Sequence, residues 1–407
     1  MTELNLIHKN ELDKLLVALV KTLDITKTQF DNLAKSYGAV GRFLEADPVF
    51  EPYHPVISPQ GSLRLGTIIQ PINEGDDLDV DLVFRLLGKS TLWTQHDIKN
   101  LVGARLKSHA TYADMLDKEE GRRCWTLLYR QESDNEKERY HMDILPCVAD
   151  KEYNNQLKRI LWTDYTLDNI KQIAIRITDK ESSDYTISVD INSWLKSNPD
   201  GYAIWFASRC KNTTEIRESM MNTIMPIGQY TEDKTILQRI VQLLKRHRDI
   251  MFGYDEDKPI SIIITTLAGQ SYNGETCLID GLCNVIDKME QNIYIDGEGH
   301  YVVRNPVNSE ENFADKWEKY PKRKDNFFAW LNAVKQLKAN LIDLKGMQLR
   351  ESLSNTFGKN PVSKAFEKMA INHKDDATAG KMKIASTGLL GSIGKTLNAN
   401  NTFYGKE

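Results

Sequence analysis

Two aspartates in one apolar run, Asp79 and Asp81, constrain this chain more than any other feature of its sequence. The run from Leu78 to Phe84 begins with the apolar–polar alternation of a β-strand. Because successive strand side chains point to opposite faces, both carboxylates lie on the same face. Carboxylates that close repel each other unless a cation lies between them. Oxygen ligands at that density suit Mg²⁺, which proteins usually hold with a few carboxylates and substrate phosphates. The run therefore predicts metal chemistry on a nucleotide.

A third aspartate stands in a second strand pattern, which runs from Arg139 to Pro146. If the two predicted strands are neighbours, Asp143 can join Asp79 and Asp81 in one cluster. Two-metal nucleotidyl transfer uses such a cluster, with ions about 4 Å apart on the attacking and leaving oxygens. Three solvated strand residues are the plain alternative. The order of Gly-Ser, D-x-D and a distant strand aspartate favours the metal cluster.

Gly61 and Ser62 precede the D-x-D run, where a strand is expected to turn into a helix. A helix N-terminus offers unpaired N–H groups and a positive dipole end, and glycine lets the backbone approach a ligand closely. A Gly-Ser dipeptide alone mostly reflects turn chemistry. Ahead of D-x-D, it predicts a clamp for the β- and γ-phosphates of a nucleoside triphosphate.

Composition bounds the class of protein. The chain has 407 residues, which is room for two lobes, and no apolar run approaches the ~20 residues of a membrane span. The N-terminus lacks the profile of a secretory signal. Five cysteines without a C-x-x-C pair argue against a disulfide framework or a structural zinc site and fit a reducing cytoplasm. The net charge of −4 argues against a stable nucleic-acid partner.

The N-terminal half predicts two amphipathic helices followed by an αβ module. Apolar residues recur at helical spacing over 12–23 and, after Asp24 or Thr26 as a cap, over 30–40. The αβ module spans about 50–195. Its predicted strands lie near 78–86, 123–130, 138–148 and 184–191, with a polar turn at 133–138 and helical or irregular chain over 150–182.

The C-terminal half is predicted to be helical. Helical periodicity covers 236–251, 278–289 and 328–344, Gly358 is expected to end a further helix, and Asn308 with Glu311 reads as a capping pair for a helix through Trp317. Gly, Lys, Asn, Ser and Thr dominate from about 374 and predict a mobile tail. The predicted parts are N-terminal helices bracing both lobes (1–48), the catalytic core (49–210), a helical lobe (211–373) and a flexible tail (374–407).

The order of Gly-Ser, D-x-D and an aspartate in h-x-D-h-x-P resembles the DNA polymerase β-like nucleotidyltransferase superfamily. Later segments narrow the resemblance to the bacterial cGAS/DncV-like nucleotidyltransferases, the cyclic-oligonucleotide synthases of anti-phage defence; these segments are 197–209, 243–249, 258–272 and 305–317. The resemblance covers roughly residues 10 to 345. It implies an α+β fold of the polymerase β-like type, with a mixed-sheet catalytic lobe and a helical second lobe.

The resemblance also implies roles for the metal ligands. Asp79 and Asp81 would bind two Mg²⁺ ions, with Mn²⁺ as an alternative metal. Asp143 would bind the catalytic ion and help to deprotonate the attacking ribose hydroxyl.

Three further residues are assigned to nucleotide binding on the resemblance. Lys245 lies in a basic cluster with Arg246 and Arg248 late in a predicted helix; favourable placement of cations at a helix end stays open as an explanation. The family uses a lysine on this helix to reach the triphosphate, and we expect Lys245 and Ser62 to lie outside the core. Ser271 and Tyr272 would contact the triphosphate and stack on a base, whereas a partly buried aromatic is the plain reading of Tyr272.

The implied activity joins ribonucleoside triphosphates, ATP and GTP, into a cyclic di- or trinucleotide. Alternatives are an oligoadenylate-type, tRNA-directed or small-molecule nucleotidyltransferase of the same fold, and a catalytically idle nucleotide-binding subunit. The expected partners are regulator or effector proteins of a defence operon. No association with a membrane is expected. Base, ring size, linkage and activating signal stay open. The chain ends Gly405-Lys406-Glu407, unlike the small residue expected for ubiquitin-like conjugation in this family.

Overall fold

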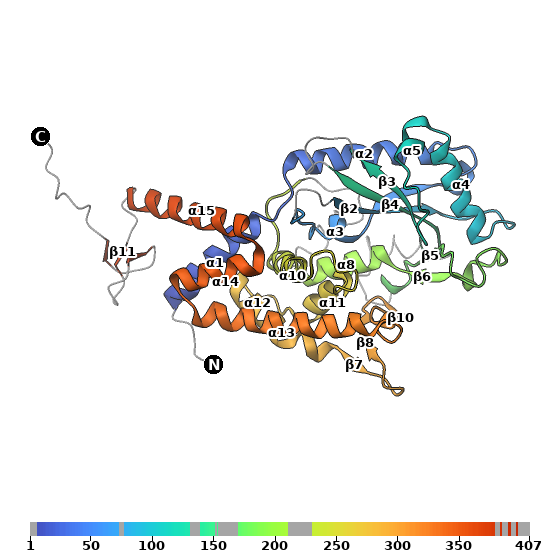
Figure 1. The fold of residues 1–407 in the computed structure, drawn as a ribbon. Coiled ribbons are helices and arrows are strands. Elements are labelled where there is room, and N and C mark those ends of the chain that lie inside the picture. Colours follow the sequence, from blue (N-terminus) through green and yellow to red (C-terminus); the bar gives the residue numbers. More distant parts are fainter. Residues whose placement is uncertain are drawn as a thin grey trace, which may run out of the picture.

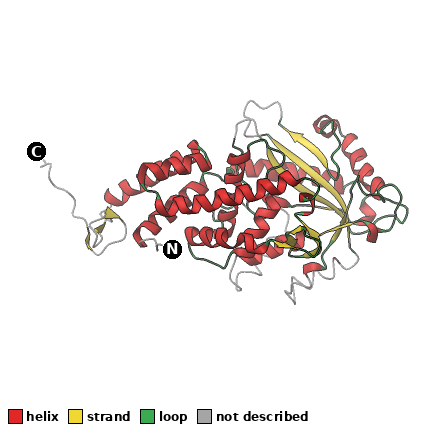
Figure 2. Ribbon diagram, turned by 60° about the horizontal axis from the view of Figure 1, so that its bottom comes forward, coloured by secondary structure: helices red, strands yellow, loops and turns green. Residues whose placement is uncertain are grey.

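The computed structural model describes most of the chain and shows two lobes side by side (Figure 1). The described residues are 6–72, 77–130, 139–150, 153, 170–210 and 230–378, with the pairs 383–384, 390–391 and 396–397. The predicted polar turn at 133–138 lies outside them, as does most of the segment 151–169. Strands gather in one lobe and helices fill the other (Figure 2).

A mixed β-sheet forms the centre of the first lobe. Its order is β1 (Val56–Pro59), β2 (Leu78–Leu86), β4 (Tyr140–Ala149), β5 (Ile175–Ile177) and β6 (Leu195–Ser197), and β3 (Trp125–Tyr129) also pairs with β4. Strands β2 and β4 run parallel, and the other pairs are antiparallel. The prediction of an α+β fold with a mixed-sheet lobe and a helical lobe is confirmed.

Side-chain alternation gives the sheet two different faces. Leu82 and Phe84 of β2 point into an apolar core with α2 (Lys27–Glu45), α4 (Gln95–Lys107) and α5 (Ala110–Met115). Val83 of β2 and Leu145 of β4 point the other way, into the core of the helical lobe. Because Asp79 and Asp81 share the parity of Val83, and Asp143 that of Leu145, all three aspartates face the helical lobe.

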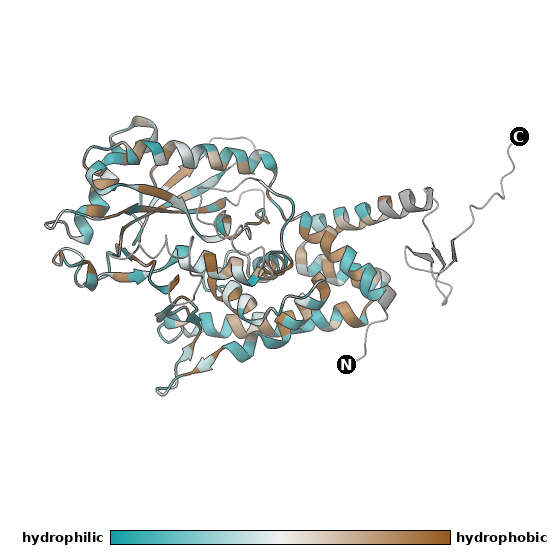
Figure 3. Cartoon of the chain, turned by 180° about the vertical axis from the view of Figure 1, so that it is seen from behind, coloured by the Kyte–Doolittle hydropathy of each residue, from teal (hydrophilic) through white to brown (hydrophobic). Residues whose placement is uncertain are grey.

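The second lobe packs its helices around α10 (Ile236–Phe252). The surrounding helices are α1 (Leu6–Lys21), α8 (Pro199–Cys210), α11 (Ser261–Ser271), α12 (Leu278–Lys288), α13 (Pro321–Asp343) and α14 (Gly346–Phe357), and α15 (Lys359–Thr378) packs on α1 and α14. Apolar stretches lie along these helices and along the sheet strands (Figure 3). The predicted helices over 236–251, 278–289 and 328–344 are confirmed. Gly358 follows α14 with a φ of 97°, a left-handed value that favours glycine.

The two N-terminal helices belong to different lobes. Helix α1 packs on α12 and α15, whereas α2 packs on β1 and α4. Of the two predicted caps, Thr26 is the N-cap of α2: it accepts a hydrogen bond from the Gln29 N–H, and the Gln29 side chain accepts one from the Thr26 N–H. Within the described residues, no helix is long and apolar enough to cross a membrane.

Three secondary-structure predictions are wrong. Residues 184–187 form a turn, 188–190 have no regular structure and a 3₁₀ helix begins at Ile191, so the predicted strand over 184–191 does not form; Ile187 is 75% exposed. The sheet edge is built instead from β5 and β6, and β5 lies within 150–182, a segment predicted to be helical or irregular. The predicted helix cap at Asn308 is the start of β10 (Asn308–Asn312), which pairs with β9 (Arg304–Asn305). The Asn308 side-chain amide donates to the Lys196 carbonyl at 3.2 Å and caps no helix. In place of the predicted helix through Trp317, this segment has the short 3₁₀ helix η5 (Asp315–Trp317).

The remaining elements are short. They are η1 (Glu51–Tyr53), α3 (Gly61–Arg64), η3 (Ile191–Ser193), η4 (Met289–Asn292), the hairpin of β7 (Tyr294–Ile295) and β8 (Tyr301–Val302), and a small sheet of β11 (Lys383–Ile384), β12 (Leu390–Gly391) and β13 (Thr396–Leu397). Helix α15 continues four residues beyond the predicted tail boundary at 374. Mobility of the tail, most of which lies outside the described residues, stays a prediction.

Candidate active site

The parallel ladder between β2 and β4 brings the three aspartates together. Asp81 lies directly opposite Asp143, and Asp79 lies opposite His141. The His141 ring in turn lies 2.7 Å from a carboxylate oxygen of Asp77. The prediction that the two strands are neighbours is confirmed. One face of two adjacent strands therefore carries three carboxylates.

The electrostatics of the cluster show an uncompensated negative charge. Burial, together with the charges of Asp143 and Asp79, raises the pKa of Asp81 from its ordinary 3.8 to about 6, and Lys245 opposes this shift. Asp79 is exposed, yet desolvation by the surrounding protein still raises its pKa; His141 opposes that shift and Asp143 adds to it. Like charges disfavour the ionised form, and a bound cation would reverse this.

The Gly-Ser turn lies against Asp81. The N–H of Gln60 donates to the Asp81 carbonyl at 2.8 Å, because β1 pairs with β2 immediately before the turn. Gly61 then adopts a φ of 60°, and a Cβ at this position would collide with the Asp81 carboxylate. Only glycine fits this close approach. Ser62 is half-buried in the first turn of α3.

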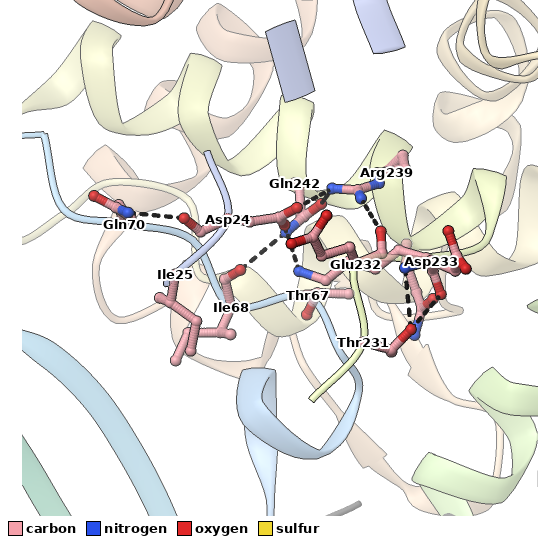
Figure 4. Close-up of polar contacts among 12 residues, drawn as sticks. Asp24, Ile25, Thr67, Ile68, Gln70, Thr231, Glu232, Asp233, Arg239 and Gln242 are labelled. Carbon is pink, nitrogen blue, oxygen red and sulfur yellow. Dashed lines mark hydrogen bonds and ion pairs between the residues drawn. The ribbon is translucent and has the colours of Figure 1, made fainter. Parts of the chain in front are cut away.

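Helix α10 of the second lobe holds the loop that follows this turn. Four of its side chains donate to main-chain carbonyls of the loop: Gln238 to Leu65 at 2.9 Å, Lys245 to Thr67 at 3.2 Å, Gln242 to Ile68 at 2.9 Å, and Arg246 to Gln70. Asp24, which lies between α1 and α2, also binds α10: its carboxylate accepts hydrogen bonds from Arg239 at 2.7 Å and from Gln242 at 2.9 Å (Figure 4). The loop after the Gly-Ser turn, which is the predicted phosphate clamp, is therefore fixed to the helical lobe.

Lys245 reaches the catalytic lobe, and the expectation that it lies outside the core is wrong. It is 7% exposed, and Arg246 and Arg248 are buried as well, so the cluster is not a solvated helix end. Burial, together with the charge of Arg248, lowers the pKa of Lys245 to about 8. The negative charges of Asp79 and Asp81 oppose that shift, so Lys245 interacts electrostatically with the acidic cluster.

Ser271 and Tyr272 do not line the cleft. Both are buried in the helical lobe, at the end of α11. The Ser271 hydroxyl accepts from the Asn292 amide at 3.0 Å, and the Tyr272 hydroxyl donates to the Glu275 carbonyl at 2.8 Å. The polar atoms of both side chains are thus engaged inside the lobe. The geometry of Tyr272 is that of a buried core aromatic, as the alternative interpretation predicted.

The three aspartates suit a hard divalent cation. They supply oxygen donors on one face of adjacent strands, where their mutual repulsion favours a bound positive charge. Within the described residues, no three His, Cys, Asp or Glu side chains already converge as a ligand set. Asp143 instead accepts a hydrogen bond from the Thr126 hydroxyl through one oxygen.

A cavity of about 680 Å³ opens between the lobes beside this cluster. Gly61 and Asp81 lie at one end of its lining, and Asn308 and Glu311 of β10 line it from the helical lobe. The segments 197–209, 258–272 and 305–317 all contribute to the wall. These are three of the four segments that carried the narrower family resemblance.

A buried ionic network beside the cavity was missed by the sequence analysis. Asp200, 3% exposed, lies at the start of α8. It accepts from Arg64, from Arg85 at 2.8 Å and from the Tyr153 hydroxyl. The network joins the phosphate-clamp turn and β2 to α8. The one signal available was the aspartate in Asn198-Pro-Asp-Gly, which reads as a helix start and says nothing of two distant arginines.

A mixed sheet that presents paired aspartates beside a Gly-Ser turn, closed by a helical lobe, is the architecture of polymerase β-like nucleotidyltransferases. Residues 11–160 match the model of the Second Messenger Oligonucleotide or Dinucleotide Synthetase domain. A c-di-GMP synthase from Roseivirga ehrenbergii is 30% identical over 410 residues, which covers 98% of each chain. The chain belongs to the bacterial cGAS/DncV-like nucleotidyltransferases and is an enzyme of that class.

Solved structures share the fold. The nucleotidyltransferase CdnG of Bradyrhizobium diazoefficiens, in complex with GTP, has a TM-score of 0.61 at 17% identity and covers 88% of this chain and 99% of its own. The cyclic AMP-GMP synthase DncV of Vibrio cholerae, in complex with the linear intermediate pppA(3′,5′)pG, has a TM-score of 0.51 at 17% identity and covers 88% of each chain.

Proposed function

We propose that this enzyme joins two ribonucleoside triphosphates into a cyclic dinucleotide, with GTP as a substrate. The observation that carries the proposal is the placement of Asp81 opposite Asp143 with Gly61 packed on the Asp81 carboxylate. The relative named a c-di-GMP synthase supports both the cyclic product and guanine as the base. The cavity of about 680 Å³ has the size of sites that hold small organic ligands.

Asp79, Asp81 and Asp143 would hold divalent cations, Mg²⁺ with Mn²⁺ as the alternative. Such ions, when bound, would lower the pKa of the attacking hydroxyl and stabilise charge on the leaving pyrophosphate. Asp143, whose second oxygen is not the acceptor for Thr126, takes the hydroxyl proton. The ribose oxygen bonds to the α-phosphorus of the neighbouring triphosphate as the bond to its β-phosphate oxygen breaks.

Gly61, Ser62 and Lys245 handle the triphosphate in this proposal. Ser62 stands in the first turn of α3, with Gly61 against the acidic cluster. Lys245 supplies positive charge from the opposite lobe and interacts electrostatically with Asp79 and Asp81. That charge compensates the pyrophosphate as it departs. A second transfer of the same kind on the linear intermediate closes the ring and releases a second pyrophosphate. Ser271 and Tyr272 have no part in this scheme.

Product analysis tests the proposal. The protein is incubated with the four ribonucleoside triphosphates and Mg²⁺, and the products are treated with phosphatase and resolved by mass. A cyclic dinucleotide has no terminal phosphate, so it survives phosphatase and has the mass of two nucleoside monophosphates minus one water per bond formed. Phosphatase-sensitive ladders would show an oligoadenylate-type enzyme, a larger ring would show a trinucleotide synthase, and transfer to added tRNA or a small molecule would show a foreign acceptor.

The anti-phage role, the cytoplasmic location and the partnership with defence-operon proteins remain proposals that rest on family membership. A host strain carrying the gene with its neighbouring genes should restrict phage, and the Asp79→Asn/Asp81→Asn variant should not. Equal plaque counts in the two strains would remove the defence role while leaving the enzymatic proposal intact.

A further inference from the structure

The wall of the cavity opposite the phosphate-clamp turn is formed by the β9–β10 hairpin. This wall carries Glu310, Glu311 and the nearby Asp315, all of which line the cavity. β10 lies beside β6 at the far edge of the sheet, where the Asn308 amide meets the Lys196 carbonyl. β6 is separated from β2 by β4 and β5, a span of roughly 14 Å at the usual strand spacing.

The proposed function decides which part of a nucleotide faces this wall. Gly61 and the three aspartates would hold the phosphates, so the base extends toward β10, where Lys196, Lys316 and Arg323 also line the cavity. A carboxylate that faces a base can only accept hydrogen bonds. A carboxylate of this wall therefore selects for a base whose edge offers donors.

Glu311 is the carboxylate of this wall that the fold holds in place. Glu310 and Asp315 are exposed, whereas Glu311 is half-buried. The buried Asn305 donates from Nδ2 to the Glu311 Oε2 at 2.7 Å, and the Asn305 Oδ1 accepts from the Val307 N–H at 2.9 Å. This second bond fixes which end of the Asn305 amide faces the glutamate.

The charge of Glu311 is also only partly compensated. Burial raises its pKa, while the Asn305 and Asn308 amides and the Arg123 guanidinium oppose the shift. No ion pair neutralises Glu311 in the described part of the chain; Arg123, which lines the same cavity, pairs with Asp179 at 2.9 Å. Because a carboxylate offers about four acceptor sites and two amides fill at most two, Glu311 has capacity left for a ligand.

We propose that Glu311 determines base specificity by accepting hydrogen bonds from N1–H and the N2 amino group of guanine. Guanine presents these two donors side by side. Adenine presents an acceptor at N1 next to its amino group, and uracil presents one donor between two acceptors, so neither matches a carboxylate. This inference rests on the proposed function for the presence of a nucleotide in the cavity, and it adds the residue that selects the base.

Inosine triphosphate, which lacks only the N2 amino group, is the probe. Affinities for GTP, ITP and ATP are measured calorimetrically in the Asp79→Asn/Asp81→Asn background, where turnover does not consume the ligand, with and without Glu311→Gln. With Glu311 intact, we expect GTP to bind about 10- to 100-fold more tightly than ITP, the effect of one hydrogen bond to a charged group. Glu311→Gln should remove that preference and weaken GTP while leaving ATP unchanged or tighter.

Two controls separate base reading from a structural role. Glu318→Gln changes an exposed carboxylate outside the cavity lining and should leave the GTP-to-ITP ratio unchanged. Glu311→Asp keeps the charge but shortens the side chain, and should retain part of the preference. Thermal melting of each variant reports on folding. Equal weakening of GTP, ITP and ATP by Glu311→Gln would overturn the inference, because it would mean a ribose contact or a structural role.

The same measurement distinguishes the two proposals. Base preference in binding does not depend on what the enzyme makes. A GTP preference that requires Glu311, found in a protein that yields no cyclic product, would sustain this inference and reject the proposed function. A cyclic guanine dinucleotide made equally well by wild-type enzyme and Glu311→Gln would do the reverse.

Discussion

Asp81 is half-buried and Asp200 is buried, yet their pKa values move in opposite directions. Burial alone raises the pKa of each carboxyl. At Asp200, Arg64 and Arg85 overcome that effect and bring the pKa down to about 2. At Asp81, the nearest charges are two further carboxylates, and the pKa rises to about 6.

In the proposed function, the difference separates a carboxylate that supports the fold from carboxylates that serve chemistry. Arg64 of α3 and Arg85 of β2 neutralise the buried charge of Asp200, and these ion pairs tie α8 to the sheet. Asp79, Asp81 and Asp143 lie on one face, and we propose that bound metal ions compensate their charge. Lys245 is the cation that approaches them from the second lobe.

The largest expected effect is on synthesis. Asp79→Asn with Asp81→Asn removes the charge that would hold Mg²⁺, and metal ions contribute several kcal/mol to such transition states. We therefore expect product formation to fall at least about a thousandfold. Thermal stability should stay the same or rise slightly, because the repulsion is relieved. Substantial residual turnover in the double variant would remove the assignment.

Asp200→Asn should show the opposite pattern, a large loss of stability. It removes the negative charge that Arg64 and Arg85 share, and breaking a buried ion pair on one side costs about 3–5 kcal/mol. Chemical denaturation measures this cost. Asp287→Asn is the matched control, since its bond to Lys338 is made by a carboxylate with 49% exposure and should be worth at most about 1 kcal/mol. Equal stability of the two variants would contradict the comparison.

Lys245→Met tests the link between the lobes with a smaller effect. The variant keeps the length of the side chain but loses its charge and its bond to the Thr67 carbonyl. Loss of one charge-assisted contact predicts a fall in kcat/KM of about ten- to a hundredfold. Ser62→Ala should cause a loss in the same direction. Lys335→Met, an exposed lysine paired with Glu290, is the control. Wild-type kinetics for Lys245→Met would leave this lysine a structural role only.

The smallest effect is a difference in the pH dependence of unfolding, measured with EDTA present. Between about pH 4 and 6, folded Asp81 keeps a proton that the unfolded chain has lost, so its contribution to stability falls as pH rises. Between about pH 2 and 4, the unfolded chain binds a proton that folded Asp200 does not, so its contribution rises with pH. Asp81→Asn should flatten the first slope and leave the second unchanged. Identical profiles for wild type and Asp81→Asn would contradict the raised pKa.

The sequence was informative where a pattern is local. The run from Leu78 to Leu86 is a strand in the structure because its alternation matches burial against both lobes, and Thr26 caps α2 through residues three apart. Strands β5 and β6 have three residues each and are defined by their neighbours, so periodicity could not find them. Asp200 meets Arg64 and Arg85 from positions more than a hundred residues apart, which no spacing rule predicts.

Residues assigned by resemblance alone gave mixed outcomes. Lys245 contacts the catalytic lobe at the Thr67 carbonyl, and its contact with a triphosphate stays a prediction; its burial contradicts the expectation that it lies outside the core. Ser271 and Tyr272 were placed by their position at the end of α11, but the helix carries them away from the cavity into the core. A position along a helix does not determine which side of it faces a cleft.

Metal-directed cleavage of the backbone tests the central claim most directly. Fe²⁺ replaces Mg²⁺ in many such sites, and with ascorbate and peroxide it cuts the chain next to where it binds. We expect cuts within β2 near Asp79 and Asp81 and within β4 near Asp143, and excess Mg²⁺ should suppress them. The cuts should vanish in Asp79→Asn/Asp81→Asn and persist in Asp287→Asn. Cleavage elsewhere, or cuts at β2 and β4 that survive the double substitution, would contradict it.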